Sequence, residues 1–565
     1  MKQTITVYLR KMNPAIASPF LPLGLFLLVS LIRISLPGLY MDSVLPDYYA
    51  AYIGHQGTIP AWIFPDNMLF SPYEYPLLSS LYGGATPAYI GKLVWSVIGY
   101  NIFSIRLLHL SYGLIIVYFC YIIIRWATEN KTIASFSAMM IAIDPSFVLA
   151  WRTQYYLQLF PLITFILSLL LFTRFIFEMR SNNKYSIRTM VLIGLLLGFS
   201  AWGYFIYTGY ALVFFGVLLI LLFSIKQKKV VIKTLSTFIV SFIGGYLPFI
   251  YAHFSIFVTQ GIQGYLTTLR SLNSAYEIGE HGDIGFLARF HHVWELVKNL
   301  SGGDVMATTM VGQRLHVGVV VGEIVFIISV LIALIFLSLR FTEWFNKQDA
   351  IQHRLYILTV LTMALIGCHI VFGIIIGPSL GYQHFVMLLP LTYLSGTGAG
   401  YGIYSCIKDR LKNKLVIKCV VAVFFVLLAA TYVNNNSNIY SNLKRTGGVG
   451  YYSDSINRLA EFAQEIPPDA VILFPQWGYW MGVATATGGT KEIWSETSIE
   501  QLIEDINNRP AKFDYYVVLE PANEQAVKDI GLQTDLSLKE IIRFHTREGI
   551  PTFFVAHYHR DNLTL

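Results

Sequence analysis

The sequence predicts a polytopic α-helical membrane protein that ends in a small α/β domain. Hydrophobic residues make up 55% of the 565 residues and charged residues only 13%, whereas soluble proteins carry about 25% charged residues. The apolar residues gather in runs long enough to cross a bilayer as helices. The C-terminal segment instead alternates short apolar stretches with amphipathic ones, which is typical of a mixed α/β domain.

Eleven runs of about 20 apolar residues are predicted to span the membrane. They are residues 15–36, 103–124, 132–151, 155–177, 189–205, 206–225, 234–255, 318–339, 355–376, 385–406 and 416–433. The stretch 189–225 contains no charged residue and is too long for one span, so we divide it near Gly203. No small-residue cleavage site follows the first run, which is therefore interpreted as a retained anchor.

Lys and Arg are distributed unevenly between the connecting loops. The N-terminal segment and loops such as KDRLKNK are basic and fall on one side, whereas residues 37–102 contain only Lys92. Because basic loops stay in the cytoplasm, we expect a protein of the cytoplasmic (inner) membrane with its N-terminus inside. Residues 37–102, 256–317 and 434–565 are then outside. The net charge of +7 therefore reflects membrane topology, and no nucleic-acid partner is expected.

The sequence is divided into a transmembrane part, 1–433, and an external α/β domain, 434–565. The domain opens with NNNSNIYSNLKRTGGVG (434–450), which is interpreted as a polar linker. Helices are predicted over SDSINRLAEFAQEI, SIEQLIEDINN and SLKEIIRFHT, and strands over AVILFP, YYVVLE and PTFFVAHY. No phosphate-binding glycine loop or nucleophile motif is found, so we expect a structural or acceptor-binding role.

Two aspartates, Asp42 and Asp47, follow the first span within a segment rich in Tyr, Trp and Pro. Aromatic residues of this kind lie at the headgroup level, so 37–102 is predicted to form short interfacial helices with Asp42 beneath them. An ionisable group placed there is a candidate functional residue, although either aspartate could instead be a solvated acid that ends a helix. A carboxylate can act as a general base or bind a divalent cation such as Mg²⁺ or Mn²⁺.

Such chemistry suits the transfer of a sugar from a lipid-linked phosphate to an acceptor hydroxyl. A transporter or flippase of lipid-linked glycans is an alternative, but transporters usually place their carboxylates deep within spans. The predicted spans here are almost free of acids, with Asp144 as the main exception. A glycan polymerase or ligase, or a non-catalytic relative, is also compatible with many spans and a large external segment.

The order of several motifs resembles the membrane-embedded GT-C glycosyltransferases, in particular the branch of protein O-mannosyltransferases and the lipid A aminoarabinose transferase (glycosyltransferase families 39 and 83). Arg33 and Asp42 match the basic and acidic residues around the first external loop of that branch. Three further segments match in order and spacing: TPAYIGKLVWSVIGYNIFSIRLL with Lys92 and Arg106, IAIDPSFVLAWRTQYYL with Asp144 and Arg152, and YQHFVMLLPL with Tyr382 and His384. Ser43 stands where the branch often has a second acid, and Ala85 or Thr86 stands where it has a basic residue just before the proline motif.

The resemblance implies a GT-C-like fold and an inverting glycosyltransferase that uses a polyprenyl-phosphate-linked monosaccharide. The acceptor would be a lipid, a glycan or a protein. Asp42 is the expected general base and Asp47 a second catalytic acid, and Asp42 is the candidate ligand for any metal. The residues expected at the donor phosphate or sugar are Arg152, His384, Lys92, Arg289 and Tyr382. Arg33, Arg106 and Asp144 are expected to support the site, with Asp42 or Asp47 as the partner of Arg106.

Overall fold

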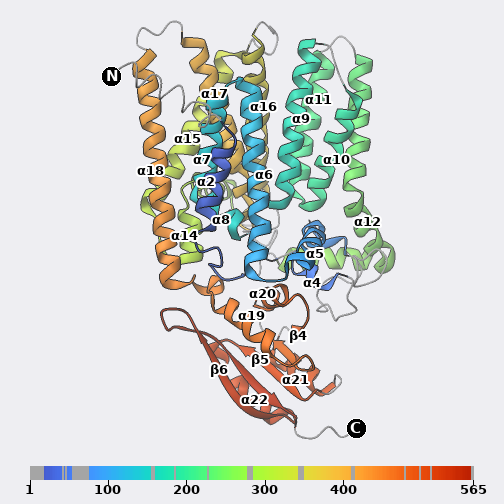
Figure 1. Ribbon diagram of the computed structural model, residues 1–565. Helices are drawn as coiled ribbons and strands as arrows, with labels where there is room; N and C mark the ends of the chain where they lie inside the picture. Colours follow the sequence, from blue (N-terminus) through green and yellow to red (C-terminus); the bar gives the residue numbers. More distant parts are fainter. Residues whose placement is uncertain are drawn as a thin grey trace.

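The computed structural model describes residues 18–40, 44, 47–53, 76–153, 159–182, 186–224, 228–275, 284–341, 349–408, 414–475, 479–495, 498–508 and 512–560. Long helices run side by side in a bundle, and a small domain built on a β-sheet lies at one end of it (Figure 1). We call this end of the bundle the domain end and the other the opposite end. Asp42 lies outside the described residues.

Each of the eleven predicted apolar runs contains helix in the part that the structure describes. The helices are α2 (Phe20–Leu31), α6 (Ile102–Thr128), α7 (Lys131–Ile143), α8 (Pro145–Thr153), α9 (Leu159–Asn182), α10 (Ile187–Gly203), α11 (Ile206–Ser224), α12 (Lys228–Ala275), α15 (His316–Leu339), α16 (Ala350–Ile376), α17 (Leu389–Ile407) and α18 (Lys414–Thr446). Within the described residues, six helices are long and apolar enough to cross a membrane, or seven if α7 and α8 form one bent span. The count of eleven crossings stays a prediction.

The outer surface of the bundle is apolar. On α12, α15 and α18 respectively, Val240, Leu331 and Val426 are 69%, 51% and 66% exposed. Large apolar side chains that face outward on long helices are typical of contact with lipid. The chain is therefore an integral membrane protein.

The apolar runs predict where the helices lie, but they do not predict every point at which one helix ends and the next begins. The predicted division near Gly203 is confirmed, because α10 ends there and α11 begins at Ile206. The predicted helix over 132–151 is instead two helices, α7 and α8, bent by 62° on either side of Asp144. Pro145 begins α8 and has no backbone N–H to continue the hydrogen bonding of α7.

The predicted interfacial segment carries short elements at the domain end (Figure 1). They are α4 (Tyr49–Tyr52), the two-stranded hairpin of β1 (Leu78–Ser80) and β2 (Gly83–Gly84), and α5 (Thr86–Ile98). The second predicted external segment contains the last turns of α12, then α13 (Phe286–Lys298) and α14 (Asp304–Val311). Two 3₁₀ turns, η3 (Tyr382–His384) and η4 (Val386–Leu388), lead into α17.

The C-terminal domain is a five-stranded mixed sheet with helices on both faces. Its strands are β3 (Val471–Phe474), β4 (Glu492–Ser495), β5 (Asp514–Leu519), β6 (Ser537–His545) and β7 (Pro551–His559), in the order β4-β3-β5-β7-β6. Its helices are α19 (Ser455–Glu465), α20 (Tyr479–Thr487), α21 (Ile499–Asn508) and α22 (Gln525–Gln533). Side chains of α19 and α20 join the core of the bundle, while α21 and α22 cover the other face of the sheet.

Two predictions for this domain were wrong. Residues 537–546, predicted to be helical, form β6, because the segment pairs antiparallel with β7 and this pairing overrides its local helical pattern. The predicted linker after residue 433 is helical as far as Thr446. Its asparagines are used within the bundle, where Asn435 donates to the Gly302 carbonyl at 3.0 Å and Asn436 to the Ile143 carbonyl at 2.8 Å.

Candidate functional site

Two buried arginines hold the chain just before Asp42. Arg106 Nη2 donates to the carbonyls of Pro37 at 2.6 Å and Gly38 at 3.3 Å, and its Nη1 donates to the Arg152 carbonyl at 2.8 Å. Of the two partners predicted for Arg106, Asp47 is bonded to His109 instead, and Asp42 lies outside the described residues. Within the described residues, the acceptors of Arg106 are backbone carbonyl oxygens.

Arg152 continues this arrangement from α8. Its Nε donates to the Leu36 carbonyl at 3.0 Å, its Nη2 donates to the Arg33 carbonyl, and its guanidinium lies 5.0 Å from the ring centre of Tyr440. The remaining nitrogen, Nη1, is buried with no assigned hydrogen-bond partner. Within the described residues, neither arginine forms an ion pair with a carboxylate. Buried cations of this kind favour a nearby anion.

A buried acid lies just after Asp42 in the chain. Asp47 Oδ2 is 2.6 Å from His109 Nε2, and both side chains are at most 2% exposed. Asp47 Oδ1 and His109 Nδ1 are buried with no assigned partner. His109 was not among the predicted site residues, although its position three residues after Arg106 puts both on one face of α6.

The C-terminal domain closes over the same segment. Gly38 N donates to the Tyr452 carbonyl at 2.8 Å, and Leu39 N donates to Asn457 Oδ1 at 3.1 Å. Further along, the rings of Tyr48 and Trp480 meet edge to face at 5.1 Å. The residues on both sides of Asp42 are therefore fixed between the helix bundle and α19–α20.

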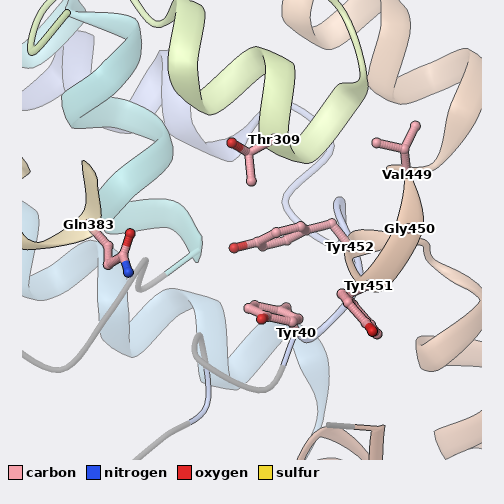
Figure 2. Close-up of a pocket in the computed structure, with 7 residues that line it drawn as sticks. All are labelled: Tyr40, Thr309, Gln383, Val449, Gly450, Tyr451 and Tyr452. Atoms are coloured by element: carbon pink, nitrogen blue, oxygen red, sulfur yellow. The ribbon is translucent and has the colours of Figure 1, made fainter. Parts of the chain in front are cut away.

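A pocket of about 360 Å³ opens at this junction. It is lined by Tyr40, Thr309, Gln383, Val449, Gly450, Tyr451 and Tyr452 (Figure 2). The Tyr40 ring centre lies 4.5 Å from that of Tyr452 and 5.8 Å from that of Tyr451. Figure 2 shows the Gln383 amide on the other side of the cavity from these rings. Aromatic walls with a few polar groups are typical of small-molecule sites.

The pocket brings together two segments singled out from the sequence. Tyr40 is two residues before Asp42, and Gln383 lies between the predicted residues Tyr382 and His384. Those two point into the protein: the Tyr382 hydroxyl donates to the Leu300 carbonyl at 2.8 Å, and His384 Nδ1 is 2.6 Å from the Tyr204 hydroxyl. The side chain of this turn that lines the pocket is Gln383, which the motif comparison did not select.

Three other predicted residues are not among those that line the pocket. Lys92 lies half-buried on α5, and Arg33 is exposed after the end of α2 with a positive φ of 53°. Arg289 joins α13 to the end of α16, since its Nε donates to the Ile284 carbonyl and its Nη1 to the Ile375 carbonyl, both at 3.1 Å.

Both carboxylate oxygens of Asp144 accept hydrogen bonds. Its Oδ1 accepts from the backbone N–H groups of Ser146 at 2.9 Å and Gly302 at 3.3 Å. Its Oδ2 accepts from the hydroxyls of Ser301 at 2.6 Å and Tyr393 at 2.8 Å. One carboxylate thus joins the α7–α8 bend to α17 and to the turn before α14.

The part of the chain that the structure describes contains no group of three or more His, Cys, Asp or Glu side chains able to hold a metal ion. Asp47 and His109 supply two ligand types but are bonded to each other. The described residues therefore do not fit a bound metal ion.

The structure is similar to two crystal structures of ArnT from Cupriavidus metallidurans, one bound to undecaprenyl phosphate and one in the apo state. Both have a TM-score of 0.53 and cover 95% of this chain and 97% of ArnT, at 11% and 10% sequence identity respectively. The apo oligosaccharyltransferase of Archaeoglobus fulgidus gives a TM-score of 0.46 at 12% identity, over 96% of this chain and 75% of that one. No family model and no curated protein matches the sequence. The GT-C-like fold predicted from the motifs is confirmed.

Proposed function

We propose that the protein is a glycosyltransferase that moves a sugar from a polyprenyl-phosphate-linked donor to an acceptor hydroxyl. The observation that carries the proposal is the aromatic pocket, in which the neighbours of Asp42 and His384 meet. The fold similarity to ArnT, whose structure contains undecaprenyl phosphate, supports a donor of this class. The domain end then faces the outside of the inner membrane, with the N-terminus in the cytoplasm.

The buried cations beside the pocket support an anionic ligand. Arg106 and Arg152 bring two positive charges to the chain before Asp42 without a carboxylate partner among the described residues. In our proposal the Asp42 carboxylate and the donor phosphate supply the negative charge. Arg152 Nη1, which has no assigned hydrogen-bond partner, is the proposed phosphate contact, and Gln383 hydrogen-bonds the sugar. His384, Tyr382, Lys92 and Arg289 stay proposed donor-binding residues.

In the proposed reaction one proton is transferred, and a new glycosidic bond replaces the bond between the sugar and the phosphate. The acceptor hydroxyl gives its proton to Asp42 while its oxygen attacks the anomeric carbon of the donor sugar. The bond from that carbon to the phosphate oxygen breaks, and polyprenyl phosphate leaves with the electron pair. Attack opposite the leaving phosphate inverts the anomeric centre. Asp47, which is bonded to His109, is the proposed second catalytic acid. It positions the segment that carries Asp42 and adds a negative charge there.

The acceptor is proposed to approach past the C-terminal domain. Tyr451 and Tyr452, which line the pocket, lie on the 3₁₀ turn before α19, so the domain contributes directly to the cavity wall. A lipid, glycan or protein hydroxyl could enter between this turn and the bundle.

The test follows transfer from labelled undecaprenyl-phosphate hexoses and pentoses in membranes that contain the full chain. Asp42→Asn is expected to lower the transfer rate by about 10²- to 10⁴-fold, because it removes the general base. Asp469→Asn, a change of the same type at an exposed position of the C-terminal domain, is the matched control and keeps the rate.

The outcomes separate the proposal from its rivals. A folded Asp42→Asn variant with unchanged transfer overturns the mechanism. Movement of labelled donor across the membrane with its glycosidic bond intact indicates a flippase instead. Growth of a glycan chain or transfer of a whole glycan indicates a polymerase or ligase.

A further inference from the structure

A second pocket lies at the opposite end of the bundle and is lined by arginines. It has a volume of about 320 Å³ and is bounded by the ends of three apolar helices, α6, α9 and α16. The residues that line it are Ile122, Arg125, Trp126, Glu129, Arg174 and Arg354. Three guanidinium groups and one carboxylate thus line the pocket, and Glu178 on α9 is a second carboxylate close to Arg174. The arginines still outnumber these two acids by one positive charge.

The arginines are arranged around one indole ring. The guanidinium carbons of Arg174 and Arg354 lie 5.9 Å and 5.7 Å from the ring centre of Trp126. Arg354 Nη1 also donates to Glu129 Oε1 at 2.7 Å, so this arginine is paired. The Nε atoms of Arg174 and Arg354 are buried with no assigned hydrogen-bond partner.

Arg125, near the end of α6, is a second arginine whose charge is not paired with Glu129. Its guanidinium donates one long hydrogen bond, 3.4 Å, to the Tyr121 hydroxyl. It forms no ion pair with any carboxylate in the described parts of the chain. A phosphate group placed in the pocket would accept from Arg125 and from the other two arginines that line it, and such charge-assisted bonds are strong.

An apolar stripe leads from the pocket along α6. Ile115, Tyr118 and Ile122 lie three and four residues apart, which puts them on one helix face. Ile122 lines the pocket, and Ile115 and Tyr118 are 38% and 42% exposed. A ligand with its phosphate among the arginines could therefore lay an acyl chain along this stripe.

We propose that this pocket binds the phosphate of a net-anionic phospholipid, with an acyl chain on the Ile115–Tyr118–Ile122 face of α6. Basic pockets between transmembrane helices are known to bind anionic headgroups. The site is at the other end of the bundle from the aromatic pocket, and its occupancy does not depend on the reaction proposed there.

The test is a titration of the purified full chain in neutral detergent, with the thermal unfolding midpoint as readout. Short-chain phosphatidylglycerol is compared with phosphatidylcholine of the same chain length and with inorganic phosphate. Phosphatidylglycerol is expected to raise the midpoint saturably. Arg125→Gln is expected to raise the apparent Kd about tenfold, the loss of one charge-assisted contact.

Arg188→Gln is the matched control, because Arg188 is an exposed arginine near the start of α10 and does not line the pocket. It is expected to leave the Kd unchanged. If Arg125→Gln fails to fold, Arg174→Gln provides the same measurement. Equal stabilisation by phosphatidylcholine, or an unchanged Kd in the folded pocket variants, overturns the proposal. Stabilisation by inorganic phosphate as strong as by phosphatidylglycerol overturns the lipid assignment.

Discussion

Asp47 and Asp144 are both fully buried aspartates near the domain end, yet their surroundings differ. Asp144 accepts four hydrogen bonds, two at each oxygen. Asp47 has one assigned partner, His109, and its Oδ1 is left without any. A carboxylate with both oxygens bonded holds helices together, whereas one with an unused oxygen is suited to chemistry or to positioning. The comparison predicts different losses when each acid is changed.

The largest expected effect on stability comes from Asp144→Ala. It removes the acceptor for four donors and leaves them buried, which we expect to cost about 3–5 kcal/mol in the free energy of unfolding. Asp144→Asn keeps one oxygen for the backbone N–H groups, and the two hydroxyls can rotate to accept from the new amide. Its cost is expected to be about 1–2 kcal/mol. Thermal unfolding of the detergent-purified chain measures both.

If the free energy of unfolding of Asp144→Ala lies within about 1 kcal/mol of the wild-type value, Asp144 does not join the α7–α8 bend to α17 in the way its contacts indicate.

Asp47→Asn is expected to act more on transfer than on stability. The amide keeps one polar contact with His109, so we expect less than about 1.5 kcal/mol of destabilisation. The transfer rate is expected to fall by about tenfold or more, because the proposed second catalytic acid loses its negative charge. The two quantities are measured on the same preparation, with Asp469→Asn as the control. A parallel loss of folded protein and of activity would make Asp47 a structural group like Asp144.

Much of the fold could be predicted because its driving force is visible in the sequence. Long apolar runs specify helices in a membrane regardless of their partners, and the division near Gly203 followed from length alone. The failures depend on distant contacts. The strand at 537–545 requires β7 as its partner, and the helix beyond residue 433 depends on Asn435 and Asn436 finding carbonyls in the bundle.

The sequence indicated which segments meet at the pocket, but not which of their side chains line it. The segments of Tyr40 and Gln383 do meet at one pocket, but a 3₁₀ turn decides that Gln383 lines it while Tyr382 and His384 point inward. No sequence period specifies this choice. His109 was missed for a related reason, since a histidine on an apolar helix has no distinguishing pattern until its partner Asp47 is placed beside it.

Asp514, in the C-terminal domain, is a third aspartate that can be compared with Asp47 and Asp144. Asp514 on β5 is 25% exposed, and its Oδ1 lies 2.7 Å from His557 Nε2 and 3.0 Å from His559 Nδ1. Partial burial raises the pKa of Asp514, but the hydrogen bonds and charges of His559 and His557 outweigh it, so the pKa lies below its ordinary value. It is a bonded acid like Asp144, but solvent weakens each of its interactions.

The smallest expected effect follows from this. Because the folded-state pKa is lowered, the stability that Asp514 contributes is present above the unfolded value, about 3.9. It is lost as the pH falls through the lower folded value. Asp514→Asn is therefore expected to cost about 0.5 kcal/mol at pH 7 and nothing at a pH below the folded value. Unfolding midpoints at both pH values, with Asp469→Asn as the exposed control, measure the difference. A cost at low pH equal to that at pH 7 would show that the two histidines recognise the shape of the side chain and not its charge.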